Sequence, residues 1–160
     1  METDKTPTGD LRNEKSPLDP LSVHLLELLT ADPRQSVADL ARQLGVSAPT
    51  ARERMRRLEQ SGVIRGYRVD IDPAAVGRPV AAWVRLSPGP GQLERIIELA
   101  RRTPEVSECH RISGEDCFLI KVHVPAVPDL EAVLDRFLVH GRTTSSFVVS
   151  TPVPPRPVLP

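Results

Sequence analysis

The spacing of apolar residues changes partway along the chain, and this change limits the folds that the chain can adopt. In residues 18–62, Leu, Val and Ala recur every three or four positions, the pattern of helices with one buried face. In residues 80–149, short apolar runs alternate with amphipathic stretches, the pattern of strands alternating with helices. A chain of 160 residues has room for two small domains. The sequence therefore predicts an α+β protein with a helical domain first.

The first block predicts three helices with clear end signals. Asp19 and Ser36 stand where they can cap the first and second helices. Gly45 is expected to end the second helix in a left-handed conformation, and Ser47 to cap a third helix. Two helices joined by a Gly-containing turn of about three residues form a helix-turn-helix. We therefore predict a helix-turn-helix, winged-helix-like domain over residues 18–64.

The second block predicts a ferredoxin-like βαββαβ domain over residues 79–150, joined to the first by an extended linker strand over residues 65–78. The expected strands are 80–86, 106–112, 117–124 and 144–149, and the expected helices are 92–101 and 129–139. The middle strands form a hairpin that turns at residues 113–116. In this register Ile112 faces Cys117, and Glu108 faces Lys121.

Both ends of the chain differ in composition from the two blocks. Residues 1–17 are polar, mixed in charge and aperiodic, so we expect a disordered tail. Residues 151–160 contain five prolines, a composition that gives extended segments and no packed element. We expect this Pro-rich tail to be unstructured and without a partner.

Several classes of protein are excluded by composition. No run of eighteen apolar residues is present, so we expect no membrane span and no membrane partner. The first residues lack the basic and apolar regions of a secretory signal, and two cysteines cannot form a disulfide framework. We therefore expect a cytoplasmic, nucleoid-associated protein.

A net charge of zero conceals a local basic stretch. Between Arg42 and Arg68 there are seven arginines and only two acidic residues, Glu53 and Glu59, which leaves a local balance of +5. Phosphate is attracted by such a local stripe and not by the charge of the whole chain. The stretch includes the third predicted helix, so double-stranded DNA is the expected partner.

One side of the third helix is expected to read DNA. Ala51, Met55 and Leu58 share the side that packs inward. The opposite side would enter the major groove, with residues near the helix start meeting base edges. We expect Pro49, Thr50, Arg52, Glu53 and Arg56 to face bases, and Ser47, Arg54 and Arg57 to contact the phosphate backbone. An isolated basic helix could be a solvated surface, but its place as the last helix of a helix-turn-helix favours DNA binding.

One face of the predicted sheet has no helix to cover it. Phe118 and Ile120 point with Cys109 toward the helices, whereas Cys117, Leu119, Lys121 and His123 share the other face with Ile112, Glu108 and His110. That face is too apolar for open water and suits a subunit interface. We expect a symmetric homodimer whose two recognition helices read a pseudo-palindrome.

No metal site, cofactor or catalytic set is expected. Cys109 and Cys117 fall on opposite faces of the hairpin and cannot share a ligand set. Cys117 borders a loop and is interpreted as a packed thiol, with a redox role as the alternative. No nucleophile elbow, phosphate-binding Gly loop, dinucleotide Gly pattern or Ser/His/Asp set is evident, so the chain is not expected to be an enzyme.

Two motifs resemble a known family. The segment 47–72 resembles the recognition helix and following strand of the Lrp/AsnC, or feast/famine, transcription regulators. Glu108-Cys109-His110, Ser113-Gly114 and the run 118–121 resemble the regulatory RAM domain of the same family. The resemblance runs from about Leu18 to Val149. It implies a homodimer built through the C-terminal sheets, often a tetramer or octamer, and an amino acid or similar metabolite bound between dimers near a Gly-acidic loop.

The same resemblance implies an effector site. Carried over by position, it comprises Ser113, Gly114, Glu115, Asp116, Thr144 and Ser146. The chain departs from the family pattern because Glu115 and Asp116 are adjacent and Cys117 takes the position of a second spaced acid. Residues 139–142 also replace a Pro-Gly-Val found in many relatives. The acidic pair is either a solvated turn or a receptor for the ammonium group of an amino acid.

We favour a ligand-responsive, sequence-specific DNA-binding transcription regulator. Two alternatives stay open. An effector-independent architectural DNA-binding protein predicts weak sequence preference and an assembly state that metabolites do not change. A small enzyme built on the α+β domain predicts turnover that does not depend on DNA.

Overall fold

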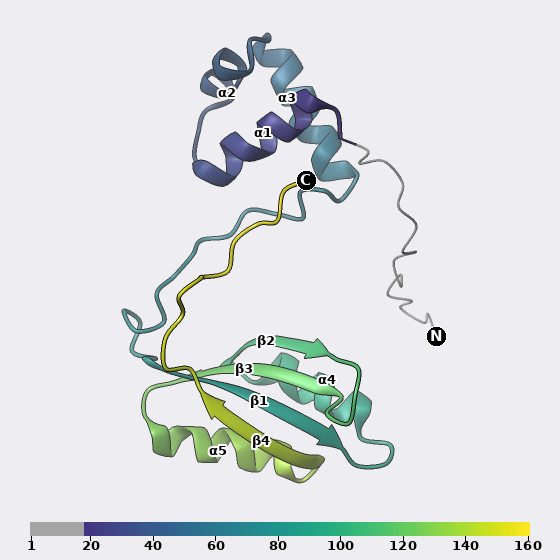
Figure 1. Ribbon diagram of the computed structural model, residues 1–160, viewed down its shortest axis with the longest axis vertical. Coiled ribbons are helices and arrows are strands. Elements are labelled where there is room, and N and C mark those ends of the chain that lie inside the picture. The colour runs from purple at the N-terminus through teal and green to yellow at the C-terminus, as the bar shows by residue number, and fades with distance from the viewer. Residues whose placement is uncertain (1–17) are drawn as a thin grey trace. The chain divides into compact units, whose positions relative to one another are not determined.

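The computed structural model describes residues 18–160, so the tail predicted over residues 1–17 lies outside the described residues. The chain divides into two compact units (Figure 1). One unit takes the chain up to Arg68 together with Pro155–Pro160, and the other is Val69–Pro154. The break at Arg68 lies within the predicted linker, but residues 65–78 form no strand, because 65–72 have no regular structure and 73–77 form a turn. Each unit is described by itself.

The helical unit contains α1 (Pro20–Ala31), α2 (Val37–Leu44) and α3 (Ala48–Gln60). The predicted caps are confirmed: the side chain of Ser36 accepts the backbone N–H of Asp39, and that of Ser47 accepts the N–H of Thr50. Gly45 ends α2 with φ of 67°, in the left-handed region that favours glycine. Local hydrogen bonding thus fixes where each helix starts and where the turn between α2 and α3 lies.

A small leucine-rich core joins the three helices. Its buried members are Leu25, Leu26, Leu29, Leu40, Ala41, Leu44, Ala51 and Leu58. The Pro-rich tail carries no helix or strand, but Leu159 is partly buried and packs against this core. Its last residues are therefore not the unpacked end that composition suggested. The proline content of the segment gives no sign that Leu159 packs against the helical core.

Asp19 holds α1 and α3 together. Its carboxylate accepts the backbone N–H of Ser22 at 2.7 Å and pairs with the guanidinium of Arg54, on α3, at 2.6 Å. Arg54 also donates to the hydroxyl of Ser22 at 3.2 Å. The hydrogen bond from Arg54, aided by those from Ser22, lowers the pKa of Asp19 to about 2. One carboxylate therefore serves both as a helix cap and as a contact between helices.

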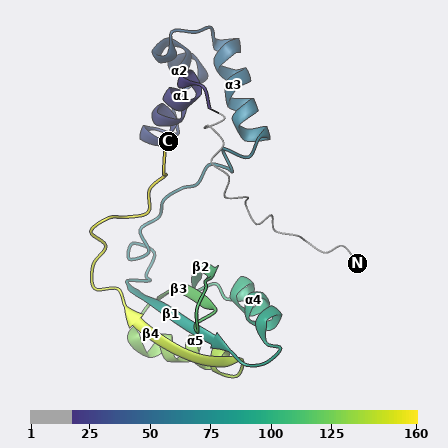
Figure 2. The same cartoon turned by 45° about the vertical axis from the view of Figure 1, so that its right-hand side comes forward.

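The second unit is a four-stranded antiparallel sheet covered on one face by two helices (Figure 2). Its elements are β1 (Val80–Pro88), α4 (Leu93–Arg102), β2 (Val106–Arg111), β3 (Phe118–Val124), α5 (Val127–Leu138) and β4 (Gly141–Phe147). The strand order is β2-β3-β1-β4. The ferredoxin-like element order predicted from the sequence is confirmed.

The predicted hairpin register is correct, although several element boundaries are shifted. Glu108 lies opposite Lys121, and the N–H of Ile112 donates to the carbonyl of Cys117 at 2.9 Å. Helix α5 begins two residues before the predicted position because Asp129 caps it from the first turn, accepting the N–H of Ala126 at 2.9 Å. Strand β4 begins at Gly141, three residues before the predicted start.

The core of the sheet unit lies between the sheet and its two helices. Alternate residues of β3, from Phe118 to Val124, are buried there with Ile96 of α4 and Phe137 of α5. Cys117 was expected on the uncovered face, but it is partly buried and packs against this core. The reason is that β3 starts at Phe118, so the strict alternation used for the prediction does not extend to Cys117.

Gly141 permits the close pairing of β4 with β1, and we predict that Gly141→Ala destabilises the sheet unit by about 1–3 kcal/mol. A Cβ atom at Gly141 would collide with the backbone carbonyl of Ser87. The matched control is Gly89→Ala, where the nearest atom to the added Cβ is the carbonyl oxygen of His140 at 3.4 Å and φ is not positive. Denaturant unfolding followed by fluorescence of Trp83, the chain's one tryptophan, reports on this unit. Equal midpoints for the two variants would contradict the prediction.

The Asp19–Arg54 pair predicts an acid-sensitive helical unit. Asp19→Asn keeps a capping side chain and removes the charge. The folded-state pKa of Asp19 is lowered from 3.8 to about 2, so the charge stabilises the fold above pH 4 and that contribution disappears as the pH falls through 2. We expect the wild type to melt above Asp19→Asn at pH 7 and the difference to shrink between pH 4 and pH 2, measured by circular dichroism. A difference that stays constant over this range would refute the ion pair.

Candidate nucleic-acid and effector sites

Helix α3 presents one buried side and one polar side. Ala51 and Leu58 are buried in the helical core, as predicted. Pro49, Thr50, Arg52, Arg56 and Arg57 are exposed, as is Ser47 just before the helix. The hydroxyl groups of Ser47 and Thr50 are 2.8 Å apart, and Ser47 caps the helix start. The first turn therefore offers backbone N–H groups and hydroxyl groups together at the positive end of the helix dipole.

Glu53 occupies the centre of the polar side and binds two arginines. Its carboxylate accepts hydrogen bonds from Nε and Nη2 of Arg56, at 2.9 and 2.8 Å, and from Nε of Arg57 at 3.0 Å. These bonds, led by those from Arg56, lower the pKa of Glu53 to about 2. The carboxylate is therefore ionised at neutral pH, and the two arginines are held against it.

Arg54 lies apart from this group. It was expected to contact the phosphate backbone, but its guanidinium is paired with Asp19 and its side chain is only 28% exposed. Asp19 precedes it by 35 residues, so a helical wheel of α3 could not reveal the pairing. We interpret Arg54 as the residue that fixes α3 against α1.

The predicted effector loop is the turn between β2 and β3. Gly114 has φ of 113°, a conformation that other residues rarely adopt. Asp116 lies 3.7 Å from the guanidinium of Arg85 on β1, and the hydroxyl of Ser87 donates to the carbonyl of Glu115 at 3.0 Å. Strand β1 thus tethers the loop at two points.

The same strand brings the two predicted β4 residues to the loop's side of the sheet. Thr144 lies opposite Arg85, and Ser146 lies opposite Trp83, in the register of β1 with β4. Facing residues share one side of a sheet, so Arg85 lies between Thr144 and the acidic loop. Arg85 is the residue that sequence reasoning missed. Its alternation with the buried Val84 and Leu86 was the available signal.

The face of the sheet opposite α4 and α5 carries a network of charged and aromatic side chains. Lys121 donates to Glu108 at 3.1 Å, and its ammonium lies 5.5 Å from the centre of the Trp83 ring. His110 approaches Glu108 at 3.3 Å. Burial raises the pKa of Glu108, but the hydrogen bonds from Lys121 and His110 outweigh it, and the pKa is below its usual value. The face is therefore polar at its centre and only partly exposed.

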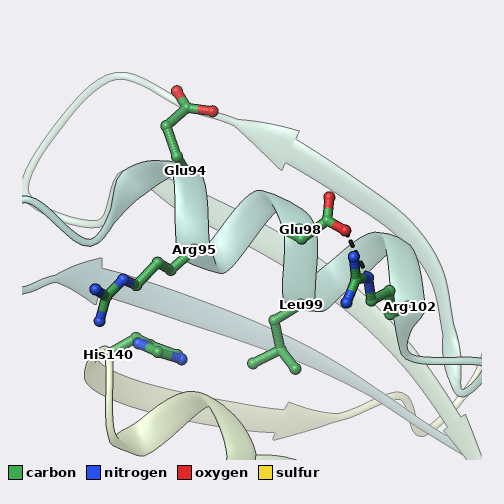
Figure 3. Close-up of a pocket in the computed structure, with 6 residues that line it drawn as sticks. All are labelled: Glu94, Arg95, Glu98, Leu99, Arg102 and His140. Carbon is green, nitrogen blue, oxygen red and sulfur yellow. Dashed lines mark ion pairs between the residues drawn. The ribbon is translucent and has the colours of Figure 1, made fainter.

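A shallow pocket of about 420 Å³ lies elsewhere in this unit, along α4 (Figure 3). Its lining residues are Glu94, Arg95, Glu98, Leu99, Arg102 and His140. None of the six predicted effector residues is among them. Because the pocket lies on the helical side of the sheet, it is distinct from the surface that Arg85 and Thr144 share.

Residues 18–160 contain neither a cluster suited to a metal ion nor a membrane-spanning helix. No three His, Cys, Asp or Glu side chains in this range lie close enough to share a metal ion. None of the helices in the same range is long and apolar enough to cross a membrane.

Family models match both units of the chain. Residues 18–65 match a winged helix-turn-helix DNA-binding model, and residues 80–158 match the Lrp/AsnC ligand binding domain. These matches bear out the predicted helix-turn-helix and regulatory domains.

Curated relatives cover nearly the same span. The transcriptional regulator LrpA of Mycobacterium tuberculosis is 33% identical over 137 residues, 84% of this chain and 91% of the relative. LrpC of Bacillus subtilis is 27% identical over 133 residues, 83% of this chain and 92% of the relative. Both are named as helix-turn-helix transcriptional regulators, which agrees with the prediction of a regulator and not an enzyme.

Solved structures agree in fold. The structure of B. subtilis LrpC superposes with a TM-score of 0.80 at 27% identity, covering 83% of this chain and 95% of that one. The regulator NMB0573 of Neisseria meningitidis, in complex with L-Met, superposes with a TM-score of 0.81 at 26% identity, covering 89% of this chain and 96% of that one. With a matched ligand-binding model, a matched DNA-binding model and a relative 33% identical across 91% of its length, the chain belongs to the Lrp/AsnC family of helix-turn-helix transcriptional regulators.

Proposed function

We propose that this regulator binds specific DNA sequences and that an amino acid or similar small metabolite changes its assembly or its affinity for DNA. One observation carries the effector half of the proposal. Arg85 and Asp116, a cation and an anion 3.7 Å apart, lie at the loop to which the family resemblance assigns effector binding. An α-amino acid carries the complementary pair of charges.

On the DNA side, the polar face of α3 would enter the major groove. Pro49, Thr50, Arg52, Glu53 and Arg56 would face base edges, and Ser47 and Arg57 would contact phosphates. The exposure of the arginines in this set supports the assignment. Arg54 is left out because a phosphate contact would require it to give up Asp19.

On the effector side, Asp116 and Glu115 would receive the ammonium group of the ligand. The carboxylate would bind Arg85 and the N–H of Gly114, with hydroxyl groups from Thr144 and Ser146 nearby. The Arg85–Asp116 contact is long, and the two side chains are 52% and 35% exposed, so opening it for a ligand costs little. The complex of the Neisseria relative with L-Met supports this class of ligand.

Assembly would proceed through the uncovered face of the sheet. A homodimer made there places two recognition helices on one DNA molecule, which suits a pseudo-palindromic site. Dimers would then join into tetramers or octamers with effector between them. The ligand changes this equilibrium only to the extent that it binds one assembly state more tightly than the other.

The test is binding to DNA from upstream of the protein's own gene, at fixed salt, with each amino acid in turn. Light scattering after size exclusion follows assembly in the same samples. A shift in affinity or mass with one amino acid supports the proposal. Specific binding without any shift contradicts the effector half, and weak sequence preference throughout would favour the architectural alternative.

For the DNA half, we predict that Arg56→Ala weakens operator binding roughly tenfold to a hundredfold and relaxes the preference at one base pair. The reason is that a bidentate contact to guanine is lost. Competition of the variant with single-base operator variants measures both effects. Unchanged preference at every position would remove Arg56 from the base-reading set.

For the effector half, we predict that Asp116→Ala binds DNA normally without effector but needs about tenfold more ligand for a half-maximal response. The variant lacks a charged partner for the ligand's ammonium group. Glu131→Ala, which removes an exposed carboxylate from α5, serves as the control. A normal response from Asp116→Ala would move the effector site away from this loop.

A further inference from the structure

Four arginines of the helical unit pair with carboxylates, namely Arg42, Arg54, Arg56 and Arg57. Asp39 holds Arg42 at 2.8 Å and Asp19 holds Arg54 at 2.6 Å, both at sites outside the polar face of α3. Glu53 is different because it stands on that face, among the residues assigned to base edges. A carboxylate in this position would approach the bases together with the arginines that it binds.

Glu53 binds two arginines at once, Arg56, which is assigned to base edges, and Arg57, which is assigned to phosphate, and we call this arrangement a clamp. Arg56 lies one turn away and is held through two parallel hydrogen bonds, whereas Arg57 is held through one. Paired in this way, the two guanidinium groups offer less charge to phosphate than two unpaired arginines would. The carboxylate itself repels phosphate. Non-specific binding depends almost entirely on such phosphate contacts, so the clamp weakens it selectively.

A specific DNA site can replace the hydrogen bonds that Glu53 makes with its two arginines. In the major groove, the N4 amino group of cytosine is a donor that a carboxylate accepts from, and the paired guanine offers O6 and N7 to an arginine. A C·G pair in reach of Glu53 would therefore satisfy the carboxylate and free Arg56 to bind guanine. An A·T pair also offers a donor, the N6 amino group of adenine, but its thymine presents only O4 and a methyl group. Arg56 would then lack the O6 and N7 acceptor pair of guanine and would stay with the carboxylate.

We propose that Glu53 is a specificity-determining residue, which holds Arg56 and Arg57 on DNA that places no C·G pair within its reach and releases them where such a pair is present. This inference rests on the proposed base-reading function of α3. The low pKa of Glu53 is consistent with it, because the carboxylate that binds the two arginines stays charged at neutral pH.

The test compares Glu53→Gln with the wild type on two duplexes of equal length, an operator selected by the wild type from a random pool and a scrambled sequence. Gln preserves size and helix propensity and removes the charge. We expect binding to the scrambled duplex to tighten about tenfold. The slope of log K against log salt should steepen by about one to two, because Arg56 and Arg57 become available to phosphates. Repeating the selection with the variant should yield sites without the C·G preference.

Glu59→Gln is the matched control, since Glu59 lies on the same helix but pairs with the hydroxyl of Tyr67 at 3.0 Å and not with an arginine. Circular dichroism establishes that both variants are folded. Scrambled-duplex affinity and salt slope that do not change in Glu53→Gln would overturn the inference while operator binding by the wild type upheld the proposed function. Equal tightening by Glu59→Gln would also overturn it, because loss of any acid would then suffice. A wild type that prefers no sequence would instead refute the proposed function.

Discussion

The proposed DNA-reading surface of α3 depends on a single carboxylate that lies outside it. Asp19 caps α1 and binds Arg54 of α3, so the start of one helix and the middle of another are fixed to the same group. This contact determines how α3 is rotated against the core, because Arg54 must face α1. With Arg54 turned toward α1, Glu53 and Arg56 lie about 100° and about 160° away around the helix and therefore face outward. The surface proposed to face DNA is thus oriented by a contact on the side of α3 that faces α1.

In the sheet unit, the position of the proposed effector residues likewise depends on the direction in which side chains point. Alternation along β1 buries Val84 and Leu86 under the helices and sends Trp83 and Arg85 to the other face. Arg85 then meets Asp116 from the hairpin on one side and lies opposite Thr144 on the other. Residues from three separate segments therefore converge because β1 is the central strand between β3 and β4. A ligand that binds there would contact the strand on which the whole sheet is assembled.

The sequence predicted those features that depend on neighbouring residues. The helix caps at Ser36 and Ser47, the left-handed Gly45 and the register of Glu108 with Lys121 follow from local signals, and each is confirmed. Features that depend on distant pairings were missed or misassigned. Arg54 was assigned to phosphate because Asp19 lies 35 residues away, and Arg85 was overlooked because its partner is on a different strand pair. The predicted start of β4 was three residues too late, because the pairing of Gly141 with β1 depends on a close approach to the backbone of Ser87 that no neighbouring residue signals.

A low DNA affinity of each single helical unit would have a consequence for regulation. If Glu53 lowers the affinity of each helical unit for arbitrary DNA, a lone unit gains little from phosphate contacts, and stable binding requires several units joined on one DNA. When helical units are joined, the binding of one raises the effective concentration of the next at the DNA. Occupancy of DNA therefore depends steeply on the number of linked helical units and on their spacing. An effector that alters assembly by a modest coupling energy would therefore change occupancy by a much larger factor than it would for a tightly binding monomer. Under the proposed function, the acidic residue in the recognition helix and the metabolite-dependent sheet interface act on the same quantity.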